Sequence, residues 1–336
     1  MVSPTSQDVA KKAGVSVATV SRVLNDSPLV SPQVRERVLS AVKELNYQPN
    51  RTAQRLRAGR SHVIGLIISD IQNPFFTSVV RGIEDVAYKY SYSVVLCNSD
   101  EDVEKEQLYI GVLSSERVAG VIIVPTGNDC CSPLLNLQMP VVMMDRVVPG
   151  LSTDFVVLDN VAGAYAAIQH LLELGHRRIG MVSAPPGISV GTERQRGYEN
   201  AMHDYGIAVD AMLIQPGNFK ENGGYQAASK LLELKPRPTA IFAANNLMTM
   251  GAYQAISDKG LRIPDDISVI GFDDMPWFGL VHPPLTAVRQ PTYEIGAQAA
   301  ELLFARLLDS TTPIQRKILQ PELIVRSSTA APARLV

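Results

Sequence analysis

The sequence predicts a small all-α head followed by an α/β body of two doubly wound parallel-sheet subdomains. Three observations predict this fold class. The first residues carry a helix-turn-helix pattern, apolar runs of strand length alternate with helical segments from His62 onward, and the alternation restarts at Val161. Unbroken apolar strands separated by helices are typical of a parallel sheet covered on both faces. We therefore expect a head, a connector and two similar α/β units.

The head begins with two short helices joined by a tight turn. Apolar residues follow a helical spacing up to Gly14, which has no Cβ to hinder a left-handed C-cap. Ser16 then offers a hydroxyl N-cap for a second helix. That helix has Val20 and Val23 on one side and small or polar residues, including Arg22, on the other. This is the pattern of a helix-turn-helix.

Double-stranded DNA is the partner that this pattern favours. The major groove admits one helix, and residues near the N-terminus of that helix reach base edges. Arg22 suits guanine, while Val17 and Ala18 are short enough to let the backbone approach the DNA and can contact a thymine methyl group. The alternative is a three-helix bundle that binds no ligand. Neutral side chains that suit the flanking phosphates are Thr5, Ser16, Thr19, Ser21 and Asn25.

A third helix and a short basic segment complete the head. Ser31 offers a cap hydroxyl, and Pro32 suits the first turn of a helix. Residues 46–60 follow, and so short a segment is marginal as a helix unless something else orders it. Apolar residues at core spacing in the third helix are Val34, Val38, Leu39, Val42 and Leu45.

These segments resemble the lactose/galactose repressor family. The resemblance rests on Asp8-Val9-Ala10, Ala13-Gly14-Val15-Ser16, residues 19–25, Tyr47 with Pro49 and Asn50, and Ala53 with Leu56.

The resemblance implies a DNA-binding headpiece, residues 1–49, and a hinge helix with linker, residues 50–61. Two hinge helices of a dimer would meet in the minor groove, where Leu56 would wedge between base steps and Ala53 would permit close approach. The alternative for Leu56 is an ordinary buried leucine at the domain junction. The DNA-binding set therefore also includes Ser31, Asn50, Arg51, Ala53 and Leu56.

The charge distribution agrees with a polyanion bound at one end. Residues 1–60 hold ten Lys and Arg against four acidic residues, a net charge of +6. The remainder holds 21 basic and 29 acidic residues, a net charge of −8. A basic head on an acidic body is typical of proteins that bind nucleic acid through the head.

The cysteines and the hydropathy indicate a cytoplasmic protein without a cofactor. Cys97, Cys130 and Cys131 are an odd number without metal-ligand spacing, so we expect reduced thiols and no metal. No apolar run approaches the roughly 20 residues that a membrane-spanning helix needs. We therefore expect no membrane partner.

The body is predicted from its alternating segments. Strands are expected at 63–69, 93–98, 118–124 and 140–145, with helices at 75–90 and 103–115. The second series has helices at 162–174, 192–205, 223–234 and 248–259, and strands at 179–183, 212–215, 239–243 and 267–272.

This layout resembles the periplasmic sugar-binding proteins. In that architecture the helix expected at 293–308 joins the first unit, and a last strand at 322–326 returns to the second. The resemblance implies an N-terminal effector subdomain of residues 62–160 and 292–321. The C-terminal effector subdomain would comprise residues 161–291 and 322–330.

A ligand of such a body is expected in the cleft beyond the carboxyl ends of the strands. Carboxylates there accept hydrogen bonds from hydroxyls, an arginine donates a planar fork, and an asparagine does both. Aromatic rings offer flat apolar faces to a sugar or a base. The candidate effector-binding residues are Phe76, Asp145, Arg194, Phe219, Asn245, Asp273 and Trp277.

The family resemblance supports three of these candidates. Arg194, Asn245 and Asp273 match positions that hold the effector, but family members often have Asn-Asp where this chain has Asn245-Asn246. Structural alternatives exist for each candidate. A strand-end aspartate often caps a turn, Arg194 could pair only with a neighbouring acid, and Trp277 could belong to an interface or a lid.

The motifs of common enzymes are missing from the sequence. We find no Gly-x-Gly-x-x-Gly after a strand, no phosphate-binding Gly-Lys-Ser/Thr loop and no Gly-x-Ser-x-Gly elbow. We therefore expect a DNA-binding transcriptional regulator, a repressor of a carbohydrate-utilisation operon that is controlled by a sugar or sugar derivative. A homodimer on a pseudopalindromic operator is expected. The alternatives are a purine-like effector, a protein corepressor, or a sugar-binding receptor without gene control.

Overall fold

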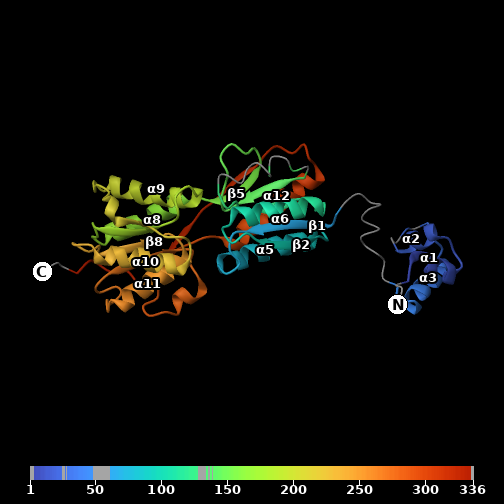
Figure 1. The fold of residues 1–336 in the computed structure, drawn as a ribbon, viewed down its shortest axis with the longest axis horizontal. Coiled ribbons are helices and arrows are strands. Elements are labelled where there is room, and N and C mark those ends of the chain that lie inside the picture. The colour runs from blue at the N-terminus through green and yellow to red at the C-terminus, as the bar shows by residue number, and fades with distance from the viewer. Residues whose placement is uncertain are drawn as a thin grey trace. The chain divides into compact units, whose positions relative to one another are not determined.

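The computed structural model of the protein describes residues 4–24, 27, 29–47, 61–127, 134, 137 and 139–333. The chain forms two compact units, Met1–Ser61 and His62–Val336 (Figure 1). Within the described ranges, no helix has both the length and the apolar character needed to cross a membrane.

The first unit contains the three predicted helices, α1 (Ser6–Ala13), α2 (Val17–Leu24) and α3 (Pro32–Glu44). Gly14 ends α1 with a φ of 64°, and the backbone N–H of Thr19 donates to the Ser16 hydroxyl at 3.2 Å. The helices enclose a small core of Val9, Ala10, Ala13, Val20, Val23, Val38 and Ala41.

Two details of α3 differ from the prediction. Ser31 is at the N-cap position, but its side chain makes no capping hydrogen bond. Leu39 is 49% exposed because it follows Val38 by one residue, which turns it about 100° away from the core-facing side. Ala41 takes the buried position instead.

The second unit has two six-stranded sheets. The first sheet has the strand order β11-β5-β4-β3-β1-β2, and each pair of neighbours is parallel. Helices α5 (Phe75–Lys89), α6 (Val103–Ser115) and α12 (Thr292–Leu308) cover it. Its strands are β1 (Val63–Ile68), β2 (Ser93–Asn98), β3 (Val121–Ile123), β4 (Val141–Met144), β5 (Asp154–Leu158) and β11 (Arg316–Leu319).

The second sheet has the order β12-β10-β9-β8-β6-β7. It is parallel except for β12, which runs antiparallel to β10 with Val288 opposite Leu323. Its strands are β6 (Ile179–Ser183), β7 (Ile214–Pro216), β8 (Ala240–Ala243), β9 (Ser268–Phe272), β10 (Thr286–Arg289) and β12 (Glu322–Ile324). Its helices are α8 (Asn160–Glu173), α9 (Ser189–Asp204), α10 (Glu221–Glu233) and α11 (Asn246–Asp258), with 3₁₀ turns η2 (Ala211–Leu213) and η3 (Pro276–Gly279).

We call the layers around the first sheet the first subdomain and those around the second sheet the second subdomain. The predicted fold class is confirmed, and three strands, β5, β10 and β11, are additional to the prediction. β10 and β11 are four-residue strands with polar or charged residues at an end, so they lack the continuous apolar run by which the other strands were predicted. β5 does contain such a run, residues 155–158, which was not assigned as a strand.

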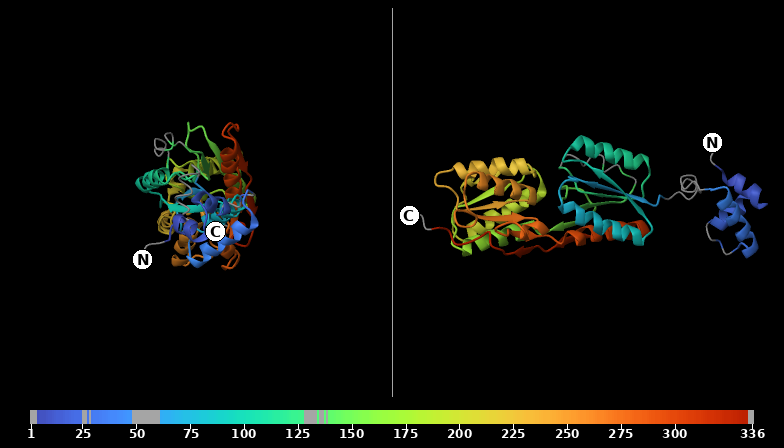
Figure 2. Two further views of the ribbon diagram at one scale, coloured as in Figure 1. Left: turned by 90° about the vertical axis from the view of Figure 1, so that its right-hand side faces the viewer. Right: turned by 90° about the horizontal axis from the view of Figure 1, so that it is seen from below.

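The chain passes between the subdomains three times, from β5 to α8, from β10 to α12 and from β11 to β12 (Figure 2). The second passage brings α12 to the first subdomain, where it packs closely on α5. A Cβ at Gly82 would lie 2.2 Å from the Tyr293 carbonyl oxygen, and one at Gly296 would lie 2.0 Å from the Val79 carbonyl oxygen. Only glycine allows the two helices to approach this closely.

Candidate functional site

The outward side of α2 carries the residues predicted to reach DNA. Val20 and Val23 are buried, whereas Ala18 and Arg22 are exposed and Val17 is half-buried. Since α2 turns its apolar side into the head core, Ala18 and Arg22 remain available to an external partner.

Two of the predicted DNA-contacting hydroxyls, those of Thr5 and Ser16, also form helix caps. Thr5 and Asp8 form a capping box: Asp8 Oδ2 accepts from the Thr5 backbone N–H at 2.8 Å, and the Thr5 hydroxyl accepts from the Asp8 N–H at 3.4 Å. The Ser16 and Thr19 hydroxyls lie 2.9 Å apart at the start of α2. Thr5 and Ser16 are exposed, while Thr19 and Ser21 are half-buried.

The structure places Ser31 on the surface at the start of α3. Five other residues predicted to contact DNA lie outside the described residues: Asn25, Asn50, Arg51, Ala53 and Leu56.

A cleft opens between the two subdomains at the carboxyl ends of their strands. Its lining atoms surround about 390 Å³ of space, counting the part that opens to solvent. Such an edge between two wound sheets is a common ligand site. The lining residues are Ser69, Asp70, Asn73, Phe75, Phe76, Glu101, Asp145, Arg146, Val190, Arg194, Phe219, Asn245, Asp273 and Gln290.

Six of the seven candidate effector-binding residues line this cleft. Trp277 does not; its ring packs edge-on against Phe278, with ring centroids 4.4 Å apart, and belongs to a separate apolar cluster around η3. Since Trp277 lies away from the cleft lining, we do not include it in the proposed site.

The backbone is strained where the cleft residues turn inward. Glu101, Asp145, Phe219 and Asp273 have left-handed φ values of 58°, 62°, 63° and 69°. A non-glycine residue pays roughly 1 kcal/mol or more for such a conformation, and these residues are typical of functional sites. These four conformations therefore lower the stability of the fold, and they direct the four side chains toward the cleft.

Arg146, which follows β4, is held by a carboxylate from the loop after β2. Its Nη1 and Nη2 each lie 2.7 Å from a carboxylate oxygen of Glu101, and Nη1 also donates to the Pro125 carbonyl at 3.3 Å. Burial acts to lower the pKa of Arg146, but the hydrogen bonds and charge of Glu101 outweigh it and raise the pKa. The arginine is thus fixed and charged at the cleft wall.

Arg194 is fixed by the second subdomain. Its Nε donates to Asn160 Oδ1 at 2.9 Å, its Nη1 donates to the Ala244 carbonyl at 2.6 Å, and its guanidinium lies 3.7 Å from the centroid of the Phe272 ring. Nη2 is 3.7 Å from Asp273 Oδ1. Most of the fork is therefore used by the fold, which leaves Nη2 as the group best placed to donate to a ligand.

The two predicted carboxylates differ in their surroundings. Asp273 accepts a hydrogen bond from Gln290 Nε2 at 2.5 Å. Burial raises the pKa of Asp145 to about 6, although the charges of Arg146 and Arg194 partly oppose it. Asp145 is thus a hydrogen-bond acceptor whose ionisation in the folded state costs free energy.

This cost leads to a stability prediction for Asp145→Asn. The folded pKa lies above the unfolded value near 3.8, so stability falls as pH rises from about 4 to 6 and stays reduced above it. Two pKa units correspond to about 3 kcal/mol. At pH 7 we expect the free energy of unfolding of the variant to exceed that of the wild type by roughly 1–3 kcal/mol. Urea denaturation measures the difference.

The advantage of Asp145→Asn should shrink at pH 4, where the wild-type carboxyl is protonated too. Asp210→Asn is the control, because this exposed carboxylate pairs with Arg178 and has a lowered pKa. An Asp145→Asn chain that is less stable than the wild type at pH 7 would contradict the account of burial.

Asn245 has a structural role as well as a place in the cleft. Its Oδ1 caps α11 by accepting from the Met248 N–H at 2.8 Å, and its Nδ2 donates to the Phe219 carbonyl at 3.0 Å. The neighbouring Asn246 donates from Nδ2 to Asn73 Oδ1 at 2.8 Å, between the two subdomains. An aspartate at 246 could not donate this bond when ionised.

Sequence reasoning missed Ser69, Glu101 and Gln290. Each comes directly after a strand or within a few residues of its end, after β1, β2 and β10 respectively. The strand-end rule that found Asp145 would also have found them, but β10 was expected only as a crossing segment.

Three polar atoms at the cleft have no hydrogen-bond partner. Among the described residues, buried side-chain atoms without a partner are Ser69 Oγ, Arg146 Nε, Gln290 Oε1 and Glu106 Oε1. All but Glu106 belong to cleft-lining residues. Because buried polar groups are rarely left unsatisfied, these atoms indicate a polar ligand.

Known proteins match both units. Residues 5–50 match the family described as bacterial regulatory proteins, lacI family, and residues 168–329 match the periplasmic binding protein-like domain. The ribose operon repressor of Halalkalibacterium halodurans is 39% identical over 325 residues, covering 97% of each chain. The chain belongs to the lacI family.

Other relatives give the same result. The HTH-type transcriptional repressor PurR of Haemophilus influenzae is 34% identical to this lacI-family chain, covering 96% of it and 98% of PurR. The lac repressor dimer bound to operator has a TM-score of 0.88 at 29% identity, covering 98% and 100%. A LacI family transcriptional regulator from Enterococcus faecium with bound ribose has a TM-score of 0.73 at 33% identity, covering 81% and 100%.

Members of the lacI family are DNA-binding transcriptional regulators and not enzymes. The protein is accordingly a sequence-specific DNA-binding transcriptional regulator, and the helix-turn-helix interpretation of its head is confirmed.

Proposed function

We propose that this regulator is a cytoplasmic repressor of a carbohydrate-utilisation operon. Its effector is a small neutral sugar of the pentose class, bound in the cleft between the two subdomains. The observation that carries the proposal is the set of buried polar atoms at the cleft that have no hydrogen-bond partner, which includes a hydroxyl, an N–H donor and an amide oxygen. A ligand with several hydroxyls satisfies all three, because each hydroxyl both donates and accepts.

The charges of the cleft favour a neutral ligand over a phosphorylated one. Four lining carboxylates, Asp70, Glu101, Asp145 and Asp273, face two lining arginines. Both arginines are already engaged by Glu101, Asn160 and carbonyl groups. A phosphate group would therefore meet more negative than positive charge, whereas hydroxyls would find acceptors.

The apolar part of the site suits a small ring. Phe76 and Phe219 are buried, line the cleft and come from different subdomains. Aromatic faces of this kind pack against the C–H side of a sugar ring. The names of the ribose operon repressor and of the ribose-bound structure support a pentose.

A purine base is the second candidate. It is favoured by the same two aromatic rings and by the 34% identity to PurR. The four lining carboxylates favour the sugar instead, because a base offers fewer hydroxyl or amine donors to them.

Isothermal titration calorimetry tests the proposal. The full chain should bind D-ribose with one site per chain and should bind ribose 5-phosphate and hypoxanthine at least about tenfold more weakly. Gel shifts with operator DNA, selected from random duplexes, then show whether ribose strengthens or releases the complex. Absence of D-ribose binding would overturn the pentose assignment, and tight hypoxanthine binding would favour the purine alternative.

We further propose that the protein acts as a homodimer through an apolar face of the first subdomain. Val95 on the edge strand β2 is 44% exposed, and Leu108 and Val112 on α6 are 61% and 45% exposed. Leu108 and Val112 are four residues apart and share one side of the helix. A second copy of the chain would cover them while holding two heads on the two halves of an operator.

The double variant Leu108→Glu, Val112→Glu should therefore be monomeric, because two buried carboxylates at an interface are costly. Multi-angle light scattering measures the mass of the particle. Leu308→Glu is the matched control, since Leu308 at the end of α12 is 77% exposed and lies outside the proposed interface. A dimeric double variant would rule out this face.

A further inference from the structure

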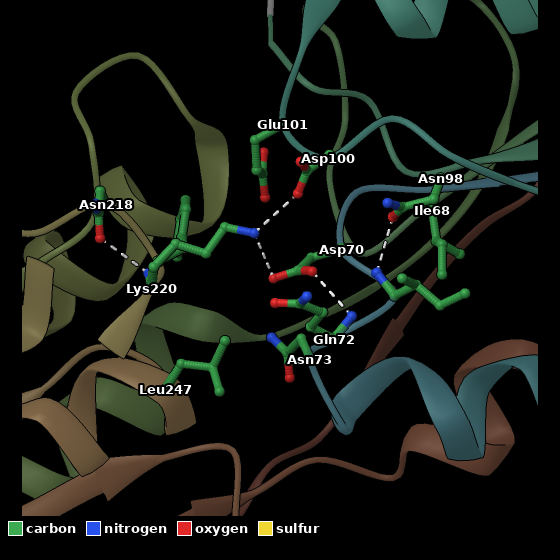
Figure 3. Close-up of polar contacts among 12 residues, drawn as sticks. Ile68, Asp70, Gln72, Asn73, Asn98, Asp100, Glu101, Asn218, Lys220 and Leu247 are labelled. Carbon is green, nitrogen blue, oxygen red and sulfur yellow. Dashed lines mark hydrogen bonds and ion pairs between the residues drawn. The ribbon is translucent and has the colours of Figure 1, made fainter. Parts of the chain in front are cut away.

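A lysine of the second subdomain reaches two carboxylates of the first (Figure 3). Lys220 Nζ lies 2.8 Å from Asp70 Oδ2 and 3.1 Å from Asp100 Oδ1. Asp70 follows β1, Asp100 follows β2, and Lys220 is the N-cap residue of α10. We call Lys220, Asp70 and Asp100 the clasp.

Local hydrogen bonds set the positions of the clasp residues. Asp70 Oδ1 accepts from the Gln72 backbone N–H at 2.9 Å, which leaves Oδ2 for the lysine. The Lys220 backbone N–H donates to Asn218 Oδ1 at 3.0 Å. Asn98 Oδ1 accepts from the Ile71 N–H at 2.8 Å and ties the loop after β1 to β2. Both sides of the clasp are therefore ordered by their own subdomain.

The clasp is directly connected to the cleft. Asp70 itself lines the cleft, Glu101 follows Asp100, and Phe219 precedes Lys220. Two more contacts cross between the subdomains nearby: the Arg146 guanidinium lies 5.0 Å from the centroid of the Phe219 ring, and Asn246 bonds to Asn73. Any movement that opens the cleft at this side must separate Lys220 from its carboxylates.

The energetics of the clasp differ from those of its neighbours. The Lys220 and Asp100 side chains are 32% and 46% exposed, whereas that of Asp70 is 6% exposed. Burial alone would lower the pKa of Lys220, but the hydrogen bonds and charges of the two carboxylates raise it. Because the clasp is partly exposed, dissolved salt screens its attraction. The buried Asn246–Asn73 bond is neutral and has no such dependence.

We propose that Lys220, Asp70 and Asp100 form an electrostatic clasp that holds the subdomains closed over the effector and sets how fast the effector leaves. The inference rests on the proposed sugar-binding function of the cleft. A ligand enclosed by both subdomains binds the closed form more tightly. A group that stabilises the closed form therefore raises ligand affinity by the factor by which it increases the closed fraction of the ligand-free chain.

The test compares two lysines that share one partner. Lys105 Nζ lies 3.6 Å from Asp100 Oδ2, but Lys105 belongs to α6 of the first subdomain and does not cross the cleft. Lys220→Met should raise the dissociation constant and the dissociation rate of D-ribose about tenfold. Lys105→Met should leave both within about twofold of wild type. Lys220→Arg, which keeps the charge, should recover most of the loss.

The salt dependence of D-ribose affinity is a second measurement. A lysine with a purely structural role would not change it. Wild-type affinity for D-ribose should fall between about 50 and 500 mM KCl because the clasp is screened. Lys220→Met should lose most of this salt dependence, and Lys105→Met should keep it. If the Lys220→Met chain releases ribose at the wild-type rate and with the wild-type salt dependence, the clasp does not hold the cleft closed.

Hydrogen–deuterium exchange separates failure of the clasp from failure of the proposed function. In the absence of sugar, residues 69–73 and 218–222 should exchange faster in Lys220→Met than in wild type or Lys105→Met. Wild-type protein that binds no D-ribose would overturn the pentose proposal, and the exchange comparison would still decide on the clasp. Unchanged exchange in Lys220→Met would overturn the clasp itself.

Discussion

Asp273→Asn should weaken D-ribose binding by about 10- to 100-fold, the loss expected when a charged acceptor of a ligand hydroxyl becomes neutral. Asp273 is 5% exposed, lines the cleft and has a left-handed φ of 69°. The amide has the same shape as the carboxylate, so the loss reports charge rather than volume. Calorimetry measures it, and gel shifts should show that operator binding responds to ribose only at proportionally higher concentration.

The adjacent Asp274→Asn is a matched control for this variant. The Asp274 side chain is also 5% exposed, but it does not line the cleft. It pairs with Arg326 at 2.8 Å and with Arg289 at 3.0 Å. We expect Asp274→Asn to lower the unfolding temperature more than the ribose affinity. Equal losses of ribose affinity in both variants would assign the effect to the loop and not to the cleft.

Arg22→Ala should lose about 10- to 100-fold in affinity for the selected operator, with the loss confined to one base-pair position. Arg22 is exposed on the outward side of α2, and its planar fork suits guanine in the major groove. Gel shifts against operators with single base-pair substitutions measure the effect. At the position read by Arg22, the variant should bind all four base pairs about equally.

Arg37→Ala is the control for the charge that Arg22→Ala removes. Arg37 is exposed on α3, in the same head. Its loss should weaken binding alike across the operator panel and reduce the salt dependence, as expected for a residue that acts only through phosphate attraction. If Arg22→Ala still selects the wild-type operator sequence, α2 does not read the bases as proposed.

The fold could be predicted from the sequence where local features, such as a helix cap, agree with the pattern of buried apolar residues. The turn at Gly14 and the central strands β1, β3, β6, β8 and β9 show continuous apolar runs or a specific cap. β11 was not predicted because it begins with Arg316 and Lys317, which hide the strand pattern, and the apolar run at residues 155–158 of β5 was overlooked. Ser31 shows that a suitable cap residue need not make the cap bond.

Cleft residues could be predicted from the sequence where they come directly after the end of a strand. Asp145 and Asp273 were found by that rule, and both lie at the cleft. Glu101 was missed although it lies just past the end of β2, within reach of that rule. Its contact at 2.7 Å with Arg146, 45 positions away, could not be read from the sequence. Trp277 was included for its chemistry, but its packing against Phe278 is set by tertiary contacts that one sequence does not reveal.

The three passages between the sheets limit how this protein can be re-engineered. No single continuous stretch of the chain contains a whole subdomain, because α12 and β11 return to the first and β12 to the second. A chimera made by exchanging residues up to one junction would combine strands of one sheet from different parents. Transplanting recognition therefore requires three coordinated exchanges, or point substitutions confined to the strand ends.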